Sequence, residues 1–348
     1  MNVNSVLKDH GVLNKKATTP VATVKMLERK QMSVSNFNSN FYTLLGSEDT
    51  LDLVRNSEIG ANKRINFETL TMTDSPLGFT PTNIGLLTVF NNSYLVLNST
   101  GTLEVYDLNY NLKKTLPLGI NEGAVYMDTN SWMIPNYNMT EITFKVYSQN
   151  EYIYVLDRNF NFIYEKVKPY ATSLRGVCKT NTGFVGFYNT GRSPVASRVV
   201  NMGFDGNSKV VTDSTVAYSG NVYNINKDVM LLLSYESNLD MYYAWNFSTN
   251  QVSSYPTKTS TISHTNVRQK RFINNSCIEL NFYNGNNIQQ IYYNKKNNTV
   301  KFISERIPNS NIGGSEKAAM SPESKIFYTI DVINSNSILD ITKYKIII

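Results

Sequence analysis

Residues that carry much of enzyme chemistry are scarce in this chain of 348 residues. It has two histidines, His10 and His264, and two cysteines, Cys178 and Cys277. Neither histidine has a second ligand at zinc spacing, and the two cysteines cannot build a disulfide framework. A Gly-x-Ser-x-Gly elbow and a phosphate-binding Gly-x-x-x-x-Gly-Lys-Ser/Thr loop are also missing. We therefore expect no enzyme activity, no catalytic residue, no metal site and no cofactor.

Long apolar runs are missing as well. No stretch of about 18 apolar residues occurs, so we expect no transmembrane helix. Lys8 and Asp9 lie where a signal peptide would be apolar. We expect the chain to stay in a reducing compartment or to leave it within a larger particle. The net charge of +6 is spread over short clusters such as Lys113 and Lys114, which indicates solvated surface rather than nucleic-acid binding.

The residues that are abundant favour β-structure. The chain contains 23 tyrosines and 16 phenylalanines together with many asparagines, and it lacks long Ala/Leu/Glu-rich stretches. Aromatic residues are enriched in strands, and asparagine is enriched in tight turns. With 41% hydrophobic and 17% charged residues, the chain has enough apolar material to fold around a core. Composition thus predicts a folded, mostly β protein.

One short motif occurs twice, about fifty residues apart. Residues 105–112 read Val-Tyr-Asp-Leu-Asn-Tyr-Asn-Leu, and residues 155–162 read Val-Leu-Asp-Arg-Asn-Phe-Asn-Phe. Both contain Asp-x-Asn-aromatic-Asn between two alternating segments, which is typical of a hairpin turn. Weaker versions of this plan occur near residues 202–207, 245–250, 293–298 and 338–342. The spacing of roughly 43 to 50 residues is the length of a four-stranded propeller blade.

Four polar residues at the ends of these strands are candidates for turn formation. They are Asp107, Asp157, Asn246 and Asn294. An Asp or Asn at such a place accepts backbone hydrogen bonds and stabilises the turn. Propellers can also host glycoside chemistry or divalent cations on carboxylates, so Asp107 and Asp157 are the residues on which a carbohydrate-cleaving alternative would depend.

The repeats predict an all-β, six-bladed β-propeller of four-stranded antiparallel blades, with seven blades as the alternative. In the first unit we expect strands at 84–90, 94–97, 102–108 and 112–118, and the second strands of later blades at 184–188, 229–235, 277–283 and 326–332. The chain ends after the third strand of the last unit. An open edge there would promote aggregation, so we expect an N-terminal strand, residues 64–72, to complete that blade.

This arrangement divides the chain into a polar N-terminal arm, residues 1–60, and a β-propeller, residues 61–348. The arm contains several lysines and an arginine, and Pro20 interrupts its Thr/Val run. It is either a surface extension or a segment that docks on a neighbouring subunit. We expect other protein subunits of a larger assembly to bind through it.

Aromatic residues in alternating strands are the candidates for binding at the surface. Packing between blades accounts for most of them, but Tyr242, Trp245 and Tyr292 are candidates to face outward. Such side chains can stack on sugars or on protein partners. A polysaccharide or a receptor is therefore a possible ligand.

Two resemblances bear on function. Residues 100–108, Thr-Gly-Thr-Leu-Glu-Val-Tyr-Asp-Leu, resemble the third strand of a WD40 blade, with Tyr106-Asp107 in the place of Trp-Asp. The degenerate units, the Asn/Tyr/Lys richness and the polar arm together look like a structural protein of a tailed-bacteriophage virion. That resemblance implies a tail or tail-associated component with copies arranged around a symmetry axis, assembled in the host cytoplasm and localised in the virion.

The function expected first is therefore a non-enzymatic virion propeller that mediates subunit assembly or attachment. One alternative is a protein-interaction scaffold in the cytoplasm. A second alternative is a propeller that binds or cleaves carbohydrate.

Overall fold

A computed structural model describes most strands of the chain and some of the connections between them. The described residues are 23–35, 41–47, 49–55, 62–75, 84–98, 100–121, 134–169, 174–189, 197–214, 218–236, 239–246, 249, 251–256, 268–273, 276–281, 287–294, 299–306, 317–320, 325–334 and 337–347. Within them, no helix long and apolar enough to cross a bilayer occurs.

The described strands form seven four-stranded antiparallel sheets. In chain order the strands are β1 (Thr23–Ser33), β2 (Phe41–Ser47), β3 (Thr50–Arg55), β4 (Lys63–Asn66), β5 (Thr71–Asp74), β6 (Ile84–Phe90), β7 (Ser93–Asn98), β8 (Thr102–Tyr106), β9 (Leu112–Pro117), β10 (Ile134–Pro135), β11 (Glu141–Tyr147), β12 (Glu151–Asp157), β13 (Phe162–Val167), β14 (Leu174–Lys179), β15 (Phe184–Asn189), β16 (Ser197–Met202), β17 (Ser208–Ser214), β18 (Tyr218–Asn226), β19 (Val229–Glu236), β20 (Leu239–Asn246), β21 (Gln251–Pro256), β22 (Arg268–Ile273), β23 (Ser276–Asn281), β24 (Asn287–Asn294), β25 (Thr299–Arg306), β26 (Lys317–Met320), β27 (Ile326–Ile333) and β28 (Ile338–Ile347). Six sheets take four consecutive strands, and the seventh has the order β1-β28-β27-β26.

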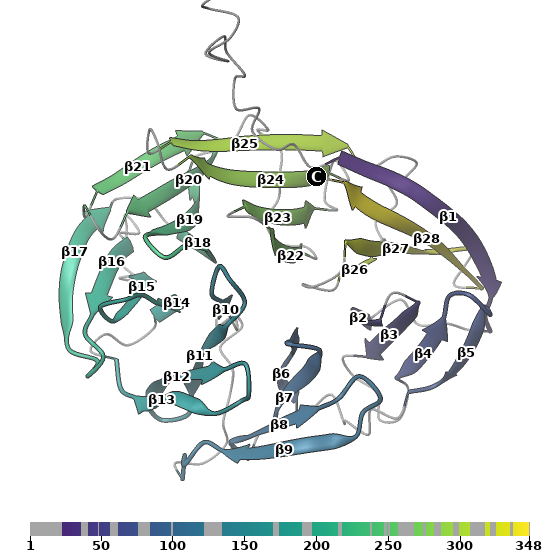
Figure 1. The fold of residues 1–348 in the computed structure, drawn as a ribbon, viewed down its shortest axis with the longest axis horizontal. Coiled ribbons are helices and arrows are strands. Elements are labelled where there is room, and N and C mark those ends of the chain that lie inside the picture. The colour runs from purple at the N-terminus through teal and green to yellow at the C-terminus, as the bar shows by residue number, and fades with distance from the viewer. Residues whose placement is uncertain are drawn as a thin grey trace, which may run out of the picture.

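The sheets are arranged in a propeller-like ring (Figure 1). The first strand of each of the six consecutive sheets lies nearest the centre, whereas in the seventh sheet β26 is innermost and β1 outermost. Burial falls from the middle of a sheet to its outer edge. The second strand β7 is buried at five consecutive positions, β8 alternates between buried and half-buried, and β9 is mostly exposed. A strand with a neighbouring sheet on both faces needs a continuous apolar run, whereas an outer strand alternates.

Most of the predicted strands lie at the places that the repeats indicated. The four strands expected at 84–118 correspond to β6, β7, β8 and β9. The four expected second strands correspond to β15, β19, β23 and β27. The first three are the second strands of their sheets, and β27 lies between β26 and β28 in the closing sheet. The hairpin repeat therefore located the middle strands of the sheets from β6 onward, but not those of the β2–β5 sheet.

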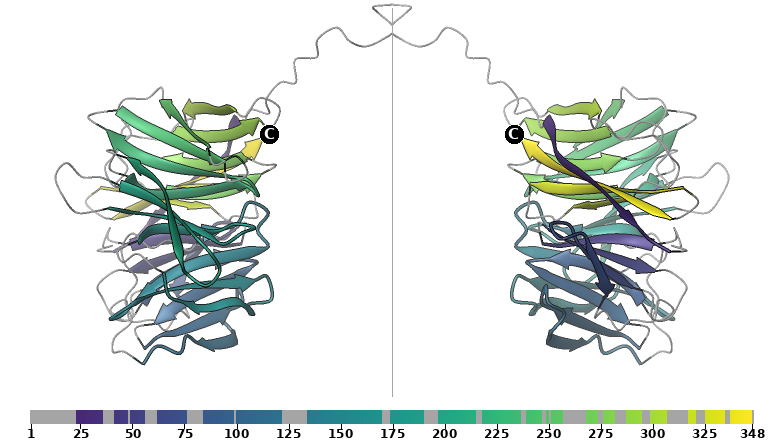
Figure 2. Two further views of the ribbon diagram at one scale, coloured as in Figure 1. Left: turned by 90° about the vertical axis from the view of Figure 1, so that its left-hand side faces the viewer. Right: turned by 90° about the vertical axis from the view of Figure 1, so that its right-hand side faces the viewer.

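The strand predicted to complete the last sheet was wrong. Residues 63–66 and 71–74 form β4 and β5, which pair with each other and belong to the β2–β5 sheet. The last sheet is instead completed by β1, which pairs with β28 from Thr23↔Ile347 to Ser33↔Ile338. Figure 2 shows this pairing as the purple strand beside the yellow one.

The same finding corrects the domain boundary and accounts for the extra sheet. Strands β1, β2 and β3 lie inside residues 1–60, so these three strands belong to the ring rather than to a separate arm. Residues 1–22 lie outside the described residues. β1 is mostly polar and exposed, because it is an outer strand, and its partner is about 310 residues away in sequence. A search for local hairpins could not find such a pair.

Side chains of β1 bind a nearly buried carboxylate on β28. Arg29 Nε donates to Asp340 Oδ1 at 2.8 Å, and Arg29 Nη2 donates to Oδ2. Gln31 Nε2 also donates to Asp340 Oδ2, at 3.0 Å. These hydrogen bonds, with the charge of Arg29, lower the pKa of Asp340. The ring closure thus combines a backbone ladder with one bidentate ion pair.

Neighbouring sheets are held together by apolar side chains from both of them. One such core joins the β6–β9 and β10–β13 sheets through residues that include Phe90, Leu116, Phe144 and Tyr154. A second core joins the closing sheet to the β2–β5 sheet, where the rings of Phe67 and Tyr328 meet edge to face at 5.1 Å. Closure by β1 therefore keeps two faces of a continuous core together.

Replacing Asp340 with Asn should lower the free energy of unfolding at pH 7 by about 1 to 3 kcal/mol, because a charge-assisted bidentate pair is lost. The pKa of Asp340 is lower in the folded state than in the unfolded state. Its stabilising effect is therefore present above the ordinary carboxyl pKa of about 4 and is lost as the pH falls below it. Urea unfolding at pH 7 and pH 3 would measure both effects.

Asp74→Asn is the matched control, because Asp74 pairs with Lys63 while its own side chain is 80% exposed. Exposed pairs contribute about 0 to 1 kcal/mol, so this variant should remain close to the wild type. Equal losses in the two variants would contradict a special role for the Asp340 closure.

Candidate interaction surface

Three turns between the third and fourth strands of consecutive sheets share one backbone pattern. In residues 107–111, the N–H of Asp107 donates to Asn111 O at 2.9 Å, and the N–H of Tyr110 donates to Asp107 O at 3.0 Å. The same two hydrogen bonds recur in residues 157–161 and in residues 203–207. The fourth residue has a positive φ in each turn, which is the geometry of a type I turn followed by a bulge.

The first and last residues of the repeated motif stabilise the turn. The carboxylate of Asp107 accepts hydrogen bonds from the backbone N–H groups of Asn109 and Asn111, at 2.8 and 2.9 Å, and from the Asn111 side chain. Asp157 accepts the equivalent hydrogen bonds from its own turn. Hydrogen bonds from the Asn111 side chain and backbone lower the pKa of Asp107. Both aspartates therefore build the hairpin.

The fourth residue of each turn contacts the preceding sheet. Tyr110 lies under the guanidinium of Arg64 on β4, 4.1 Å from the ring centroid to Cζ. Phe160 meets Phe90 of β6 edge to face at 6.2 Å. In the third turn the residue is Gly206, and a Cβ there would lie 2.1 Å from Lys168 O. The turns therefore fix the spacing between neighbouring sheets.

Basic side chains bind the same turns from the preceding sheet. Lys114 Nζ donates to Phe160 O at 2.8 Å, and Arg64 Nη2 donates to Leu108 O at 3.3 Å. Lys30 of β1 makes the equivalent contact with Phe67 O at 3.2 Å, 4.6 Å from the Phe67 ring centroid. These lysine and arginine side chains therefore link neighbouring sheets by hydrogen bonds and cation–π contacts.

A buried charged network joins the β2–β5 and β6–β9 sheets. The side chain of Asp52 is fully buried and accepts hydrogen bonds from Arg64 Nε at 3.0 Å and from the hydroxyl of Tyr94 at 2.8 Å. The Tyr94 and Tyr110 rings stack at 4.7 Å. Burial first, and then the charge of Asp52, raise the pKa of Tyr94. The tyrosine thus stays neutral and serves as a hydrogen-bond donor.

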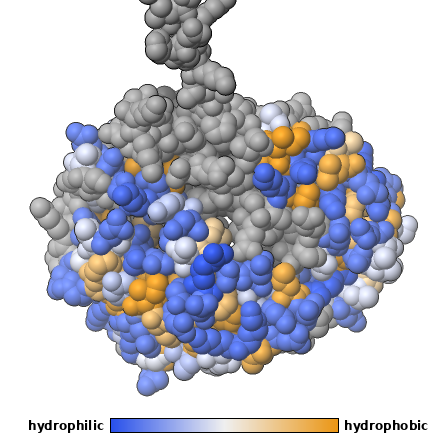
Figure 3. Space-filling view, viewed as in Figure 1, coloured by the Kyte–Doolittle hydropathy of each residue, from blue (hydrophilic) through white to orange (hydrophobic). Residues whose placement is uncertain are grey.

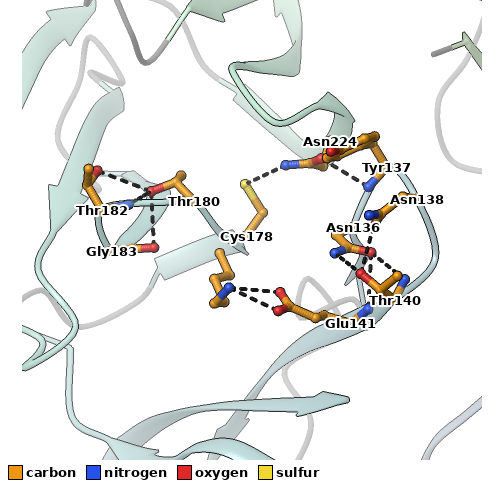
Figure 4. Close-up of polar contacts among 11 residues, drawn as sticks. Asn136, Tyr137, Asn138, Thr140, Glu141, Cys178, Thr180, Thr182, Gly183 and Asn224 are labelled. Atoms are coloured by element: carbon orange, nitrogen blue, oxygen red, sulfur yellow. Dashed lines mark hydrogen bonds and ion pairs between the residues drawn. The ribbon is translucent and has the colours of Figure 1, made fainter. Parts of the chain in front are cut away.

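The inner rim of the ring brings together the β10–β11 turn, the β14–β15 turn and strand β18 from three consecutive sheets (Figure 4). The turn between β10 and β11 is stabilised by Asn136, whose Oδ1 accepts from the N–H of Thr140 at 2.8 Å and of Glu141 at 3.1 Å. Asn136 Nδ2 donates to Thr140 Oγ1 at 2.9 Å. Glu141 in turn pairs with Lys179 of β14 at 2.9 Å.

The same turn reaches past the neighbouring sheet. The backbone N–H of Tyr137 donates to Asn224 Oδ1 on β18 at 3.1 Å, so the β10–β13 sheet contacts the β18–β21 sheet directly. The sheet that lies between them in sequence contributes Cys178, which is buried beside Asn224. Burial raises the pKa of the Cys178 thiol to about 12, so the thiol is protonated near neutral pH.

We define the inner-rim surface by Tyr137, Asn138, Asn181 and Thr182, which lie on the β10–β11 and β14–β15 turns. Asn138, Asn181 and Thr182 are exposed, and Tyr137 is half-buried. Their supports, Asn136 and Asn224, are occupied by hydrogen bonds within the fold. In Figure 3 the described part of this face is mostly hydrophilic, with apolar residues in separate small patches. The inner rim is therefore a rigid, polar and uncharged surface.

The structure places the other predicted site residues differently. Trp245 was predicted as a surface-binding residue, but its side chain is fully buried, which corrects that prediction. Tyr242 lies on β20 and Tyr292 on β24, and their side chains lie outside the described residues. Asn246 Oδ1 accepts from the N–H of Thr249 at 3.2 Å, as a turn residue does. Asn294 ends β24, and its side chain is also not described.

The histidines and cysteines of the chain do not contribute to the inner-rim surface in the described residues. His10, His264 and the side chain of Cys277 lie outside the described residues. In the described part of the chain, no three His, Cys, Asp or Glu side chains gather in a way that could hold a metal ion. The residues of the inner rim were not singled out from the sequence, because Asn and Thr are common in every turn of the chain.

No family model and no curated protein matches this chain. Similar solved structures include a chain from the crystal structure of the mitotic checkpoint complex, with a TM-score of 0.49, 10% identity, and coverage of 95% of this chain and 98% of that one. Another is a chain from the structure of BBS1N in complex with ARL6DN, with a TM-score of 0.47, 12% identity, and coverage of 92% and 96%. At these scores the likenesses indicate nothing about what this chain binds.

Replacing Gly206 with Ala should destabilise the protein strongly. Its φ of +82° is unfavourable for Ala, and the added Cβ would lie 2.1 Å from Lys168 O, so the turn would have to move. Gly119→Ala is the matched control, because its φ is +64° and the Cβ would meet nothing within 4 Å. We expect about 1 to 2 kcal/mol for Gly119→Ala and clearly more for Gly206→Ala. Equal losses in urea unfolding would contradict close docking of this turn.

Asn136→Ala should destabilise the β10–β11 turn by about 1 to 2 kcal/mol, because the partly buried hydrogen-bond partners of Asn136, the N–H groups of Thr140 and Glu141, would lose their acceptor. The exposed Asn138, which accepts only from Thr140 Oγ1 at 2.7 Å, provides the control. Asn138→Ala should stay within about 0.5 kcal/mol of the wild type. Hydrogen exchange of the 136–141 amides would detect the difference, and equal protection in both variants would contradict the assigned role of Asn136.

Proposed function

We propose that the seven sheets are the blades of a seven-bladed β-propeller closed by β1, and that the protein is a non-enzymatic scaffold that binds other proteins. The observation that carries this proposal is the inner-rim surface. Its exposed Asn138 lies on the β10–β11 turn, which hydrogen-bonds to Asn224 of β18, and its exposed Thr182 lies on the β14–β15 turn, whose N–H groups bond within the turn. The ion pair of Glu141 with Lys179 links the strands that these two turns join. A rigid surface loses little conformational entropy on binding, which favours protein recognition.

The use of the acidic residues supports a binding role. Asp52 is bound by Arg64 and Tyr94, and Asp340 is bound by Arg29 and Gln31. The repeated turn aspartates are likewise occupied by backbone N–H groups. A general acid or base needs a proton that it can exchange with a substrate. Carboxylates that already accept several hydrogen bonds are poorly suited to this role, which weakens the carbohydrate-cleaving alternative.

A place in a virion remains a further proposal, on the general resemblance given above. It is compatible with a scaffold, because a virion component also works through protein partners. The inner-rim surface favours protein binding without indicating which assembly the partners form.

Asn138→Arg combined with Thr182→Arg should abolish partner capture, because two long cations would cover the inner rim. The tagged chain would be incubated with extract of its source organism, and retained proteins would be identified by mass spectrometry and chemical crosslinking. Asn159→Arg is the control, because Asn159 is an exposed residue of a turn away from the rim. We expect at least a tenfold loss of the retained partner in the double variant alone.

Two results would contradict the proposal. Retention of no protein by the wild type would argue against a scaffold. Equal retention by the double variant and by Asn159→Arg would show that the partner binds elsewhere, and crosslinks from the partner to outer-strand lysines would then indicate where.

A further inference from the structure

β1 is attached to its sheet in a way that a second copy of the chain could reproduce. It lies at the opposite end of the chain from β28 and contacts that strand along its whole length, from Thr23↔Ile347 to Ser33↔Ile338. Residues 34–40 connect it to β2, and seven extended residues could span roughly 25 Å. The strand is therefore a separate element on a short connection.

Few apolar side chains hold β1 in place. Of its eleven residues only Val24 and Met32 are buried, and Leu27 is 43% exposed. Its other described attachments include the backbone ladder, the hydrogen bonds of Arg29 and Gln31 with Asp340, and the contact of Lys30 with Phe67. Directly after the strand, Val34 is buried and its N–H donates to Ser337 O at 2.8 Å. All of these contacts are made to the rest of the ring and would be the same on an identical ring.

β28, in contrast, needs a partner strand. It is ten residues long and buries Leu339, Ile341, Tyr344 and Ile346. Without β1 its edge would present unpaired backbone groups beside these apolar residues, and such an edge pairs readily with another chain. The strand whose register and side chains already fit it is β1, from this copy or from another.

The outer edge of β1 is protected from such pairing. Lys25 is exposed on β1, and the register shifts between Met26 and Glu28, which places a bulge at Leu27. Charged residues and bulges prevent a further strand from adding to a sheet edge. A second copy therefore cannot extend the sheet beyond β1, and must replace β1 to reach β28.

From these contacts we infer that β1 exchanges between copies of this chain, so that β1 of one copy pairs with β28 of another. The partner is a second copy, which contributes the strand that completes the ring. The inference goes beyond the scaffold proposed above and does not depend on the inner rim. Closed and exchanged forms contain the same contacts, so concentration and the connection of residues 34–40 decide between them.

Mixing two full-length variants would test the exchange. Lys25 and Lys345 are register partners and both are exposed, so one chain would carry K25C and the other K345C. After incubation at increasing concentration and mild oxidation, we expect a covalent dimer in which mass spectrometry finds a disulfide between the two substituted positions. Light scattering should show the matching increase in dimer. Each variant alone controls for disulfides with the natural cysteines.

Arg29→Ala gives an independent kinetic test. Loss of its hydrogen bonds with Asp340 should speed the release of β1 about tenfold while the final dimer fraction stays the same, because both forms lose the same contact. Lys25→Ala is the control on the same strand and should leave the rate unchanged. The rate can be followed by light scattering after a change in concentration.

Chains that remain monomeric at every concentration would overturn the inference. It would also be overturned by a dimer whose formation rate is insensitive to Arg29→Ala, since that dimer would form through another surface. Either result would leave the scaffold proposal intact, because partner capture by the inner rim is measured separately.

Discussion

The antiparallel pairing of β1 with β28 is the contact on which the rest of the ring depends. It joins the two ends of the chain through a backbone ladder and the hydrogen bonds of Arg29 and Gln31 with Asp340. The closing sheet packs its apolar face on the β2–β5 sheet, so loss of this pairing would expose both an edge and a core. Closure thus converts a row of sheets, each too small to be stable alone, into one structure.

Within the ring, one turn geometry determines how the sheets are spaced. The Asp and the last Asn of the repeated motif form the turn, and the aromatic residue or glycine at its fourth position contacts the preceding sheet. Lysine and arginine side chains then bind the turn carbonyls. Asp107 and Asp157, which the sequence offered as candidate ligand-binding residues, therefore stabilise turns of the fold. The proposed function depends instead on the exposed residues of the inner rim.

The inner-rim surface is suited to binding because hydrogen bonds hold its turns in one conformation. The β10–β11 turn of the inner rim is connected to a sheet that is not its neighbour in sequence, through the hydrogen bond from Tyr137 to Asn224 of β18. Binding there would need little rearrangement, which is an advantage for a scaffold. An exchangeable β1 would add a second way to assemble, because it would join copies through the closure rather than through the rim.

Local features of this protein could be predicted from its sequence, because they depend on residues close together in the chain. The β class, the second strands and the hairpin positions of Asp107 and Asp157 follow from alternation and from one repeated turn. Only the tertiary structure decided which strand closes the ring, since β1 and β28 recognise each other across the whole chain and β1 has the polar pattern of an outer strand. It also decided that Trp245 is buried and that the β10–β11 turn contacts β18, because contacts between sheets leave no periodic pattern in the sequence of either segment.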